Sequence, residues 1–210
     1  MTALDAASLV FYPSGYKESK LYSIKPTDGT GDLTFTRASS ATRVNEQGLI
    51  EGVRTNLIPY SENFNNWSKS GWTLTSGVLG PNGDLDAFSV LRTTGTSFAQ
   101  TLSLLSNTTY TFSAYIKNVN ATNIQLRVQN QAGNTSGTES NCVVFSVTAQ
   151  TNTSDFTRIS HTFNTGDAGA YGIFLGYYSA GEYIVYGAQV ELGSTATAYI
   201  PTSGAAVSVG

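Results

Sequence analysis

The stretch Thr-Tyr-Thr-Phe-Ser-Ala-Tyr-Ile-Lys-Asn, residues 109–118, carries the clearest structural signal in the chain. Every second residue belongs to one apolar face: Tyr110, Phe112, Ala114 and Ile116. The residues between them are mostly Thr, Ser and Lys. A period of two with polar partners is typical of a half-buried β-strand. The stretch therefore predicts a strand whose apolar face meets a core.

The same alternation recurs on both sides of this stretch. It appears over 123–130 and again at Val143, Phe145 and Val147. Near the end of the chain it predicts a long inward-facing row: Ile184, Tyr186, Ala188, Val190 and Leu192. Turn signals rich in Gly, Asn and Ser separate these runs, and no window keeps a helical period. About eight to ten strands at this spacing predict an all-β fold, a jelly-roll β-sandwich over residues 56–200.

Composition agrees with this fold class and excludes several functions. Only 12% of the residues are charged, while Gly numbers 21, Tyr 12 and Phe 10, a profile that favours a sandwich over a helical protein. The net charge is −3 and no basic run occurs, so no nucleic-acid partner is expected. A single cysteine, Cys142, excludes an intramolecular disulfide. The N-terminus shows neither a secretory signal nor a membrane-spanning segment, so we expect folding in a cytoplasm and no membrane insertion.

Residues 1–55 differ from the rest of the chain in having shorter apolar runs and fewer large apolar residues. Short apolar runs are expected to stop at Pro13 and Pro26, and three short strand candidates follow: Leu33–Arg37, Ala41–Asn45 and Leu49–Val53. Large apolar residues are few for this length, so the segment is predicted to pack on the main domain or on a neighbouring subunit. Residues 201–210 form a small-residue C-terminal tail.

Two aromatic regions are candidate glycan sites. Trp67 and Trp72 bracket a short loop beside Asn65, and tryptophan next to amides suits sugar recognition. Core packing is the simpler interpretation for Trp72, while for Trp67 both interpretations stay open. Alternation places Tyr177 inward and Tyr178 outward. Trp67, Asn65 and Tyr178 are therefore the predicted glycan-binding residues.

Residues that could support catalysis form no recognisable pattern. The one histidine, His161, is in phase with Ile159 and Phe163, so we expect a structural role for it. No nucleophile motif occurs, and nothing marks a pair of carboxylates of the kind that a glycosidase needs. The sequence predicts a protein that is not an enzyme.

Three segments together resemble a protein family. They are LTFTRASSATRVNEQGLIEGVRTNLIPYSENF (33–64), TYTFSAYIKN (109–118) and VYGAQVELGSTATAYIPTSG (185–204). Their order and spacing are similar to those of phage virion proteins that carry a carbohydrate-binding-module-like or lectin-like jelly roll. Such proteins occur as head-decoration, head-fibre and tail-associated components, so the resemblance implies a virion location and other virion proteins as partners.

The resemblance also implies roles for particular residues. Jelly-roll carbohydrate modules often hold a structural calcium ion, and Glu62 and Glu191 are the acidic positions that match by location. No other cofactor is expected. Arg37 and Arg43 flank a small turn in the block that leads into the jelly roll, where they would help to dock the protein. The simpler interpretation of these two arginines is a solvated hairpin.

Three functions follow from these observations. The first is a non-enzymatic virion structural protein, expected to be a homo-oligomer and, from the habit of phage fibres, a trimer. The second is a glycan-binding adhesion module that recognises a host surface sugar through many weak sites. The third is an accessory domain of a polysaccharide-degrading enzyme. Aromatic residues exposed in a groove would favour the glycan-binding module, whereas aromatic residues in contacts between chains would favour the structural protein.

Overall fold

A computed structural model describes residues 7–17, 20–34, 42–44, 50–130, 142–166 and 168–209. These residues form β-strands joined by turns and two 3-10 segments, with no α-helix in the described ranges, so the all-β prediction is confirmed. Within the same ranges, no helix has the length and apolar character needed to cross a membrane. The chain divides into two compact units, residues 1–53 and 54–209, which are described separately.

The first unit contains two small antiparallel sheets. One is formed by β1 (Val10–Lys17), β2 (Lys20–Lys25) and β3 (Leu33–Thr34), and the other by β4 (Thr42–Val44) and β5 (Ile50–Gly52). The last three strands fall inside the three predicted ranges, parts of which lie outside the described residues.

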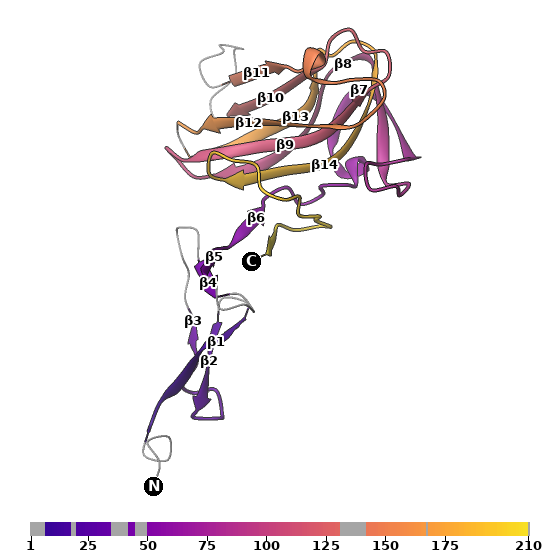
Figure 1. The fold of residues 1–210 in the computed structure, drawn as a ribbon. Helices are drawn as coiled ribbons and strands as arrows, with labels where there is room; N and C mark the ends of the chain where they lie inside the picture. Colours follow the sequence, from indigo (N-terminus) through magenta and orange to yellow (C-terminus); the bar gives the residue numbers. More distant parts are fainter. Residues whose placement is uncertain are drawn as a thin grey trace. The chain divides into compact units, whose positions relative to one another are not determined.

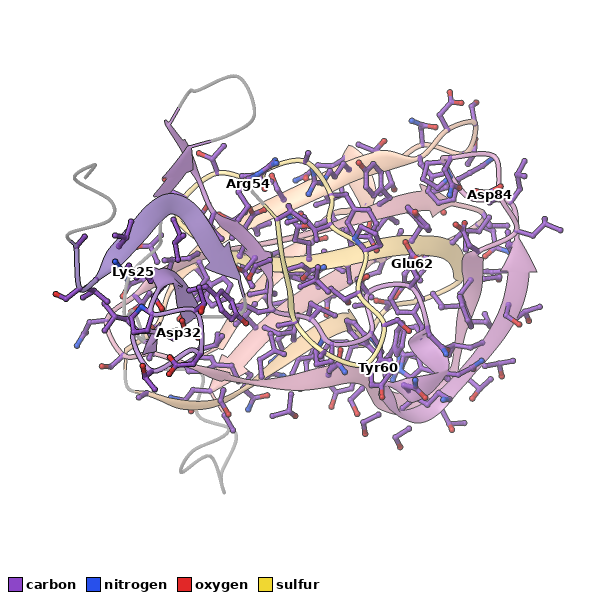
Figure 2. All side chains as sticks on the ribbon, turned by 90° about the horizontal axis from the view of Figure 1, so that it is seen from below. Lys25, Asp32, Arg54, Tyr60, Glu62 and Asp84 are labelled. Carbon is purple, nitrogen blue, oxygen red and sulfur yellow. The ribbon has the colours of Figure 1, made fainter. Side chains whose placement is uncertain are left out.

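The expected stop of the first strand at Pro13 is wrong. Strand β1 continues to Lys17, and its pairing with β2 is irregular between Phe11 and Tyr16. The proline therefore sits in an irregular part of the ladder, where a missing N–H donor is tolerated. The loop after β2 is held by Asp32, whose Oδ1 accepts hydrogen bonds from the backbone N–H and the hydroxyl of Ser23 (2.8 and 3.1 Å; Asp32 is labelled in Figure 2).

The second unit is a jelly-roll β-sandwich (Figure 1). Its strands pair in the order β11-β10-β13-β8-β14-β9-β12, with β7 added on β8. Their bounds are β7 (Ser68–Val78), β8 (Ala87–Leu104), β9 (Thr109–Asn118), β10 (Gln125–Asn130), β11 (Cys142–Ser146), β12 (Thr157–Asn164), β13 (Gly169–Tyr177) and β14 (Glu182–Leu192).

Strand β8 belongs to both layers of the sandwich. Its first part, Phe88–Leu91, pairs with β14, and its second part, Ser97–Leu104, pairs with β13. Between the two parts the ladder of β8 with β7 shifts register between Ser70 and Trp72. The two backbones approach very closely there, because a Cβ on Gly95 would lie 1.5 Å from the carbonyl oxygen of Ser70. Only glycine fits at this close approach.

The core lies between the two layers. It contains the four apolar residues of the stretch 109–118, all buried as predicted: Tyr110, Phe112, Ala114 and Ile116. The inward row predicted on β14 is partly wrong. Tyr183, Val185, Ala188 and Val190 are wholly buried there, whereas Ile184 is half-buried and Leu192 is 45% exposed.

A bulge in β14 explains the error at Ile184 and Tyr186, which precede it. The ladder with β9 shifts between Tyr186 and Gln189, and Gly187 lies inside the shift with a φ of +61°. An extra residue in one strand reverses which side chains face the core. Before the bulge Val185 pairs with the core residue Ile116, so Tyr186 points to the opposite face.

Two segments, which we call the crossing segments, pack against β14 (Figure 1), and the first hydrogen-bonds through its backbone to Ala188 and Val190 of that strand. One contains β6 (Arg54–Asn56) and η1 (Phe64–Asn66), and the other is the C-terminal segment that ends in β15 (Val207–Val209), which pairs with β6. Asn56 joins both segments to the sheet, because its amide nitrogen donates to the carbonyl oxygens of Ala188 and Ile200 (3.0 and 2.8 Å).

Candidate functional site

Trp67 is a core residue, which contradicts its prediction as a glycan-binding residue. It is 2% exposed, and its ring packs on Phe64 and Phe98 with centroid distances of 5.4 and 5.5 Å. The indole N–H donates to the carbonyl oxygen of Tyr60 at 2.8 Å. A ring enclosed in this way presents no face on which a sugar could stack. Trp72 is also buried, as predicted.

Asn65 keeps its surface position but loses its aromatic neighbour. It lies exposed in η1, where its backbone carbonyl accepts a hydrogen bond from the Lys69 ammonium group at 3.0 Å. With the Trp67 ring turned inward, this amide has no stacking platform beside it, and the structure does not combine the two residues into a sugar site.

Tyr178 is exposed as predicted, while Tyr177 faces the opposite way from its prediction. The ladder between β13 and β8 shifts between Phe174 and Gly176, so Leu175 is an extra residue. A Cβ on Gly176 would point into the core, 2.3 Å from the Trp72 ring. Tyr177 therefore projects outward, on the same face as Phe174.

The outward tyrosines form part of a continuous row of rings and guanidinium groups. We call it the aromatic–arginine row, and it consists of Arg92, Tyr178, Tyr177, Arg127 and Phe174. The rings of Tyr177 and Tyr178 lie 4.5 Å apart, and Phe174 lies 5.8 Å from Tyr177. The guanidinium carbon of Arg92 lies 5.2 Å from the centroid of the Tyr178 ring.

Arg127 occupies the centre of this row. Its guanidinium carbon lies 4.0 Å from the centroid of Tyr177 and 5.7 Å from that of Phe174. It comes from β10, and across the ladders it is paired with Phe174 on one side and with the half-exposed Val144 on the other. The row therefore lies on the side of the layer formed by β8, β13, β10 and β11 that faces away from the core, with Tyr178 exposed and with Phe174 and Arg127 only 6% and 7% exposed.

Hydrogen bonds hold the exposed end of the row in place. Tyr178 has a φ of +50°, which is uncommon for a residue other than glycine. Its carbonyl oxygen accepts from the side-chain amide of Asn123 at 3.4 Å, and the next residue, Ser179, accepts through its carbonyl from Arg92 at 3.4 Å. The ring of Tyr178 is thus presented to solvent, 47% exposed, on a fixed turn.

A second polar cluster lies under the crossing segments, around Glu62 (labelled in Figure 2). The hydroxyls of Tyr186 and Tyr199 both donate to Glu62 Oε1 at 3.1 Å. Burial raises the pKa of both hydroxyls above the ordinary tyrosine value, and the negative charge of Glu62 raises both further. These contacts attach the Glu62 segment and the C-terminal segment to β14, which is a structural role.

The two carboxylates proposed for calcium do not fit that ion. Glu191 is 2% exposed, and its oxygens accept hydrogen bonds from the side-chain amide of Gln189 and from the N–H and hydroxyl of Thr197 at 2.6–2.9 Å. Glu62 has a separate set of partners. In the part of the chain that the structure describes, no group of three or more His, Cys, Asp or Glu could hold a metal ion. Calcium needs 6–8 oxygens, which these donor-lined carboxylates do not offer together.

The predicted docking arginines are only partly covered by the structure. Arg37 lies outside the described residues. Arg43 is described through its backbone alone, which pairs with Glu51 in the β4–β5 hairpin. Their docking role stays a prediction.

His161 lies at the side of the sandwich, where it joins the two layers. Its ring, from β12, stacks on that of Phe145 from β11 with a centroid distance of 3.4 Å and an interplanar angle of 19°. Desolvation lowers the pKa of His161 below its ordinary value. The contact supports the structural role that the sequence predicted.

The aspartates of the β7–β8 turn are held by one amide. Asn82 donates through its side-chain nitrogen to Asp84 at 3.2 Å and to Asp86 at 2.7 Å (Asp84 is labelled in Figure 2). The turn therefore keeps these two carboxylates side by side. Glycoside hydrolysis requires two carboxylates that face each other across a cleft, so this pair does not suit it.

Comparison with known proteins concerns the fold. No family model and no curated protein matches this chain. Among solved structures, the xylan-binding CBM22-1 domain of Paenibacillus barcinonensis Xyn10C is 12% identical with a TM-score of 0.47, and the match covers 68% of this chain and 94% of that one. The enzymatically active domain of tailspike protein 4 of bacteriophage CBA120 is 17% identical with a TM-score of 0.48, and the match covers 66% of this chain and 21% of that one.

A third similar structure is a family 16 carbohydrate-binding module. It is 18% identical with a TM-score of 0.43, and the match covers 63% of this chain and 95% of that one. At these identities and TM-scores the similarity does not transfer a ligand or a partner to this chain. What this chain binds has to be argued from its own surface.

Proposed function

We propose that this chain is a non-catalytic glycan-binding protein and that the aromatic–arginine row is its binding surface. The observation that carries the proposal is the pair of tyrosines 177 and 178, whose rings touch on the outer face of the sandwich with Tyr178 47% exposed. Tyrosine combines an apolar ring face with a hydroxyl, so it can stack on a sugar and also hydrogen-bond to it.

The surroundings of the row suit a sugar ligand. Guanidinium groups lie at two places along it, and each offers N–H donors in a fixed geometry. Fixed rings lose little conformational entropy on binding, which favours weak but specific recognition of a flexible polysaccharide. Several copies of such a site on one particle would raise the overall avidity.

The first prediction tests this surface with Tyr178→Ala. We expect the purified chain to bind members of a glycan array, and the variant to bind the best of them about two- to tenfold more weakly, since an aromatic contact contributes roughly 0.5–1.5 kcal/mol. Isothermal titration calorimetry on the selected glycan measures the change. Tyr22→Ala is the matched control, because Tyr22 is 43% exposed but belongs to the other unit. Equal weakening by both variants, or an array without any signal, would contradict the proposal.

We further propose that the chain is carried on a phage particle, as a capsid decoration, a head fibre or a tail-associated protein. The three sequence segments that resemble virion proteins support this location. The first unit supports an attachment role, since its small sheet exposes large side chains: Leu9, Tyr22 and Leu33 are 43–50% exposed. We propose that this unit docks on other virion proteins and on further copies of the chain, as a trimer.

Particle composition tests the second proposal. Quantitative mass spectrometry of purified particles should find this chain at a constant ratio to the major capsid protein. A high ratio would correspond to decoration of the shell, and a low ratio to a vertex or the tail. Absence from particles would contradict the proposal and favour an accessory domain of a polysaccharide-degrading enzyme.

A further inference from the structure

Arg127 is a buried cation with no hydrogen-bond acceptor among the described residues. The residue is 7% exposed, and its Nε atom is fully buried without a partner. Its guanidinium group lies against the rings of Phe174 and Tyr177. A guanidinium group stays protonated at any ordinary pH, so this position always carries a positive charge.

This arrangement is unfavourable for the free protein. A buried charge is normally paired and its N–H donors are normally satisfied. Contact with two rings compensates for part of the lost hydration, because a cation is attracted to a ring face. It supplies no acceptor for the N–H groups. The remaining donors are therefore available to a ligand that approaches along the row.

Arg158 shows what a structural arginine in the same fold looks like. It also lies over a tyrosine, with its guanidinium carbon 5.5 Å from the centroid of Tyr115. Its Nε is likewise buried without a partner, but its terminal nitrogens donate to the carbonyl oxygen of Thr197 and, at 3.0 Å, to the hydroxyl of Ser113. These bonds fix the C-terminal segment on the sheet. Arg127 has no equivalent partners, and its burial lacks a structural reason of this kind.

The charge of the row is also unbalanced. Arg92 adds a second guanidinium at Tyr178, and no ion pair with a carboxylate is found for either arginine in the described ranges. The whole chain nevertheless carries 14 acidic residues against 11 basic ones. An excess of positive charge at one aromatic surface of an acidic protein favours an anionic ligand.

We propose that the aromatic–arginine row binds an acidic glycan, one whose sugars carry a carboxylate, and that Arg127 receives this carboxylate. The planar guanidinium offers parallel N–H donors that match the two oxygens of a carboxylate. The tyrosine rings beside it contact the sugar ring. This inference rests on the proposed glycan-binding function, whose substrate class it names.

The test compares each acidic glycan with its neutral form. Hexasaccharides of galacturonic, mannuronic and sialic acid are titrated calorimetrically beside their methyl esters, which keep the sugar chain and remove the charge. We expect at least one acid to bind the protein ten times or more tighter than its ester. Arg127→Gln should lower the affinity for that acid to the level of the ester, and Arg127→Lys should recover only part of it. Arg158→Gln is the matched control and should leave the affinity unchanged.

The outcomes separate the two proposals. Binding of neutral and esterified glycans with no preference for any acid overturns the acidic-glycan inference and leaves glycan binding intact. Binding to none of the glycans, acidic or neutral, overturns both.

Thermal melting of the free protein gives a readout that needs no ligand. Arg127→Met removes an unpaired buried charge and keeps an unbranched side chain, so the melting temperature should stay equal or rise. Arg158→Met, which breaks two hydrogen bonds, should lower it. A clear fall in melting temperature for Arg127→Met would show that Arg127 is a structural residue and would overturn the inference.

Discussion

For single side chains, the position in the fold decides whether an aromatic residue packs in the core or is exposed for binding. The two tryptophans, which are the usual sugar-stacking residues, are enclosed in the core, whereas Tyr178 is exposed and stands with Tyr177 beside the buried Arg127. Alternation correctly predicted the buried row of β9. Tyr178 is exposed as expected, but for another reason: it lies in the turn after β13 with a φ of +50°. Alternation could not predict the role of Arg127, because nothing in the sequence around this residue shows that no acceptor lies beside it.

His161 gives a prediction at the same scale. Burial lowers the pKa of His161 in the folded chain below the ordinary value of 6.5 that it has when unfolded. Between these two values the unfolded chain binds more protons, so the stability contributed by neutral His161 is complete above about pH 6.5 and is lost as the pH falls below it. His161→Phe keeps the stack on Phe145 and cannot titrate. The fall in melting temperature from pH 7.5 to pH 5.0 should be smaller in this variant than in the original chain. Equal falls would show that His161 does not titrate differently in the folded chain.

At the scale of elements, the strands could be predicted and the bulges could not. The strand signal comes from alternating side chains, which the sequence displays directly. A bulge depends on the partner strand, and the one in β13 reversed the predicted direction of Tyr177 just as the one in β14 reversed that of Tyr186. Gly187 with its positive φ is a local signal for the second bulge. Leu175, at the first, is an ordinary strand residue, and the outward direction of Tyr177 was missed for this reason.

The close approach of β7 and β8 at Gly95 provides a prediction about an element. Gly95→Ala should destabilise the second unit by roughly 3 kcal/mol, near the upper end of overpacking effects, because its Cβ would overlap the backbone of Ser70. Gly166→Ala is the matched control, since a Cβ there meets nothing within 4 Å. Urea unfolding followed by tryptophan fluorescence measures both, and both tryptophans belong to the second unit. Similar unfolding midpoints for the two variants would contradict the prediction, because β7 and β8 would then accommodate the added Cβ without a loss of stability.

At the scale of the whole molecule, the sandwich is closed by contacts between distant parts of the sequence. Asn56 makes four buried hydrogen bonds, and the partners in three of them, Ala188, Val190 and Ile200, lie 132–144 residues further along the chain. The C-terminal residues, expected from their small size to be a tail, include β15, which pairs with β6. Neither contact could be predicted, because small polar residues at chain ends carry no periodic signal.

Asn56→Ala tests whether this closure stabilises the fold. The variant leaves the carbonyl oxygens of Ala188 and Ile200 and the N–H groups of Ile58 and Val190 without their buried partner. Each such group costs about 1–3 kcal/mol if water cannot reach it, and partial relaxation should limit the total to about 3 kcal/mol. Thr55→Ala, which removes one exposed hydrogen bond to Ser208, should cost less than about 1 kcal/mol. Urea unfolding followed by the buried tryptophans gives both values. If the two variants unfold at the same urea concentration, the crossing segments are not part of the cooperative unit, and the sandwich is stable without them.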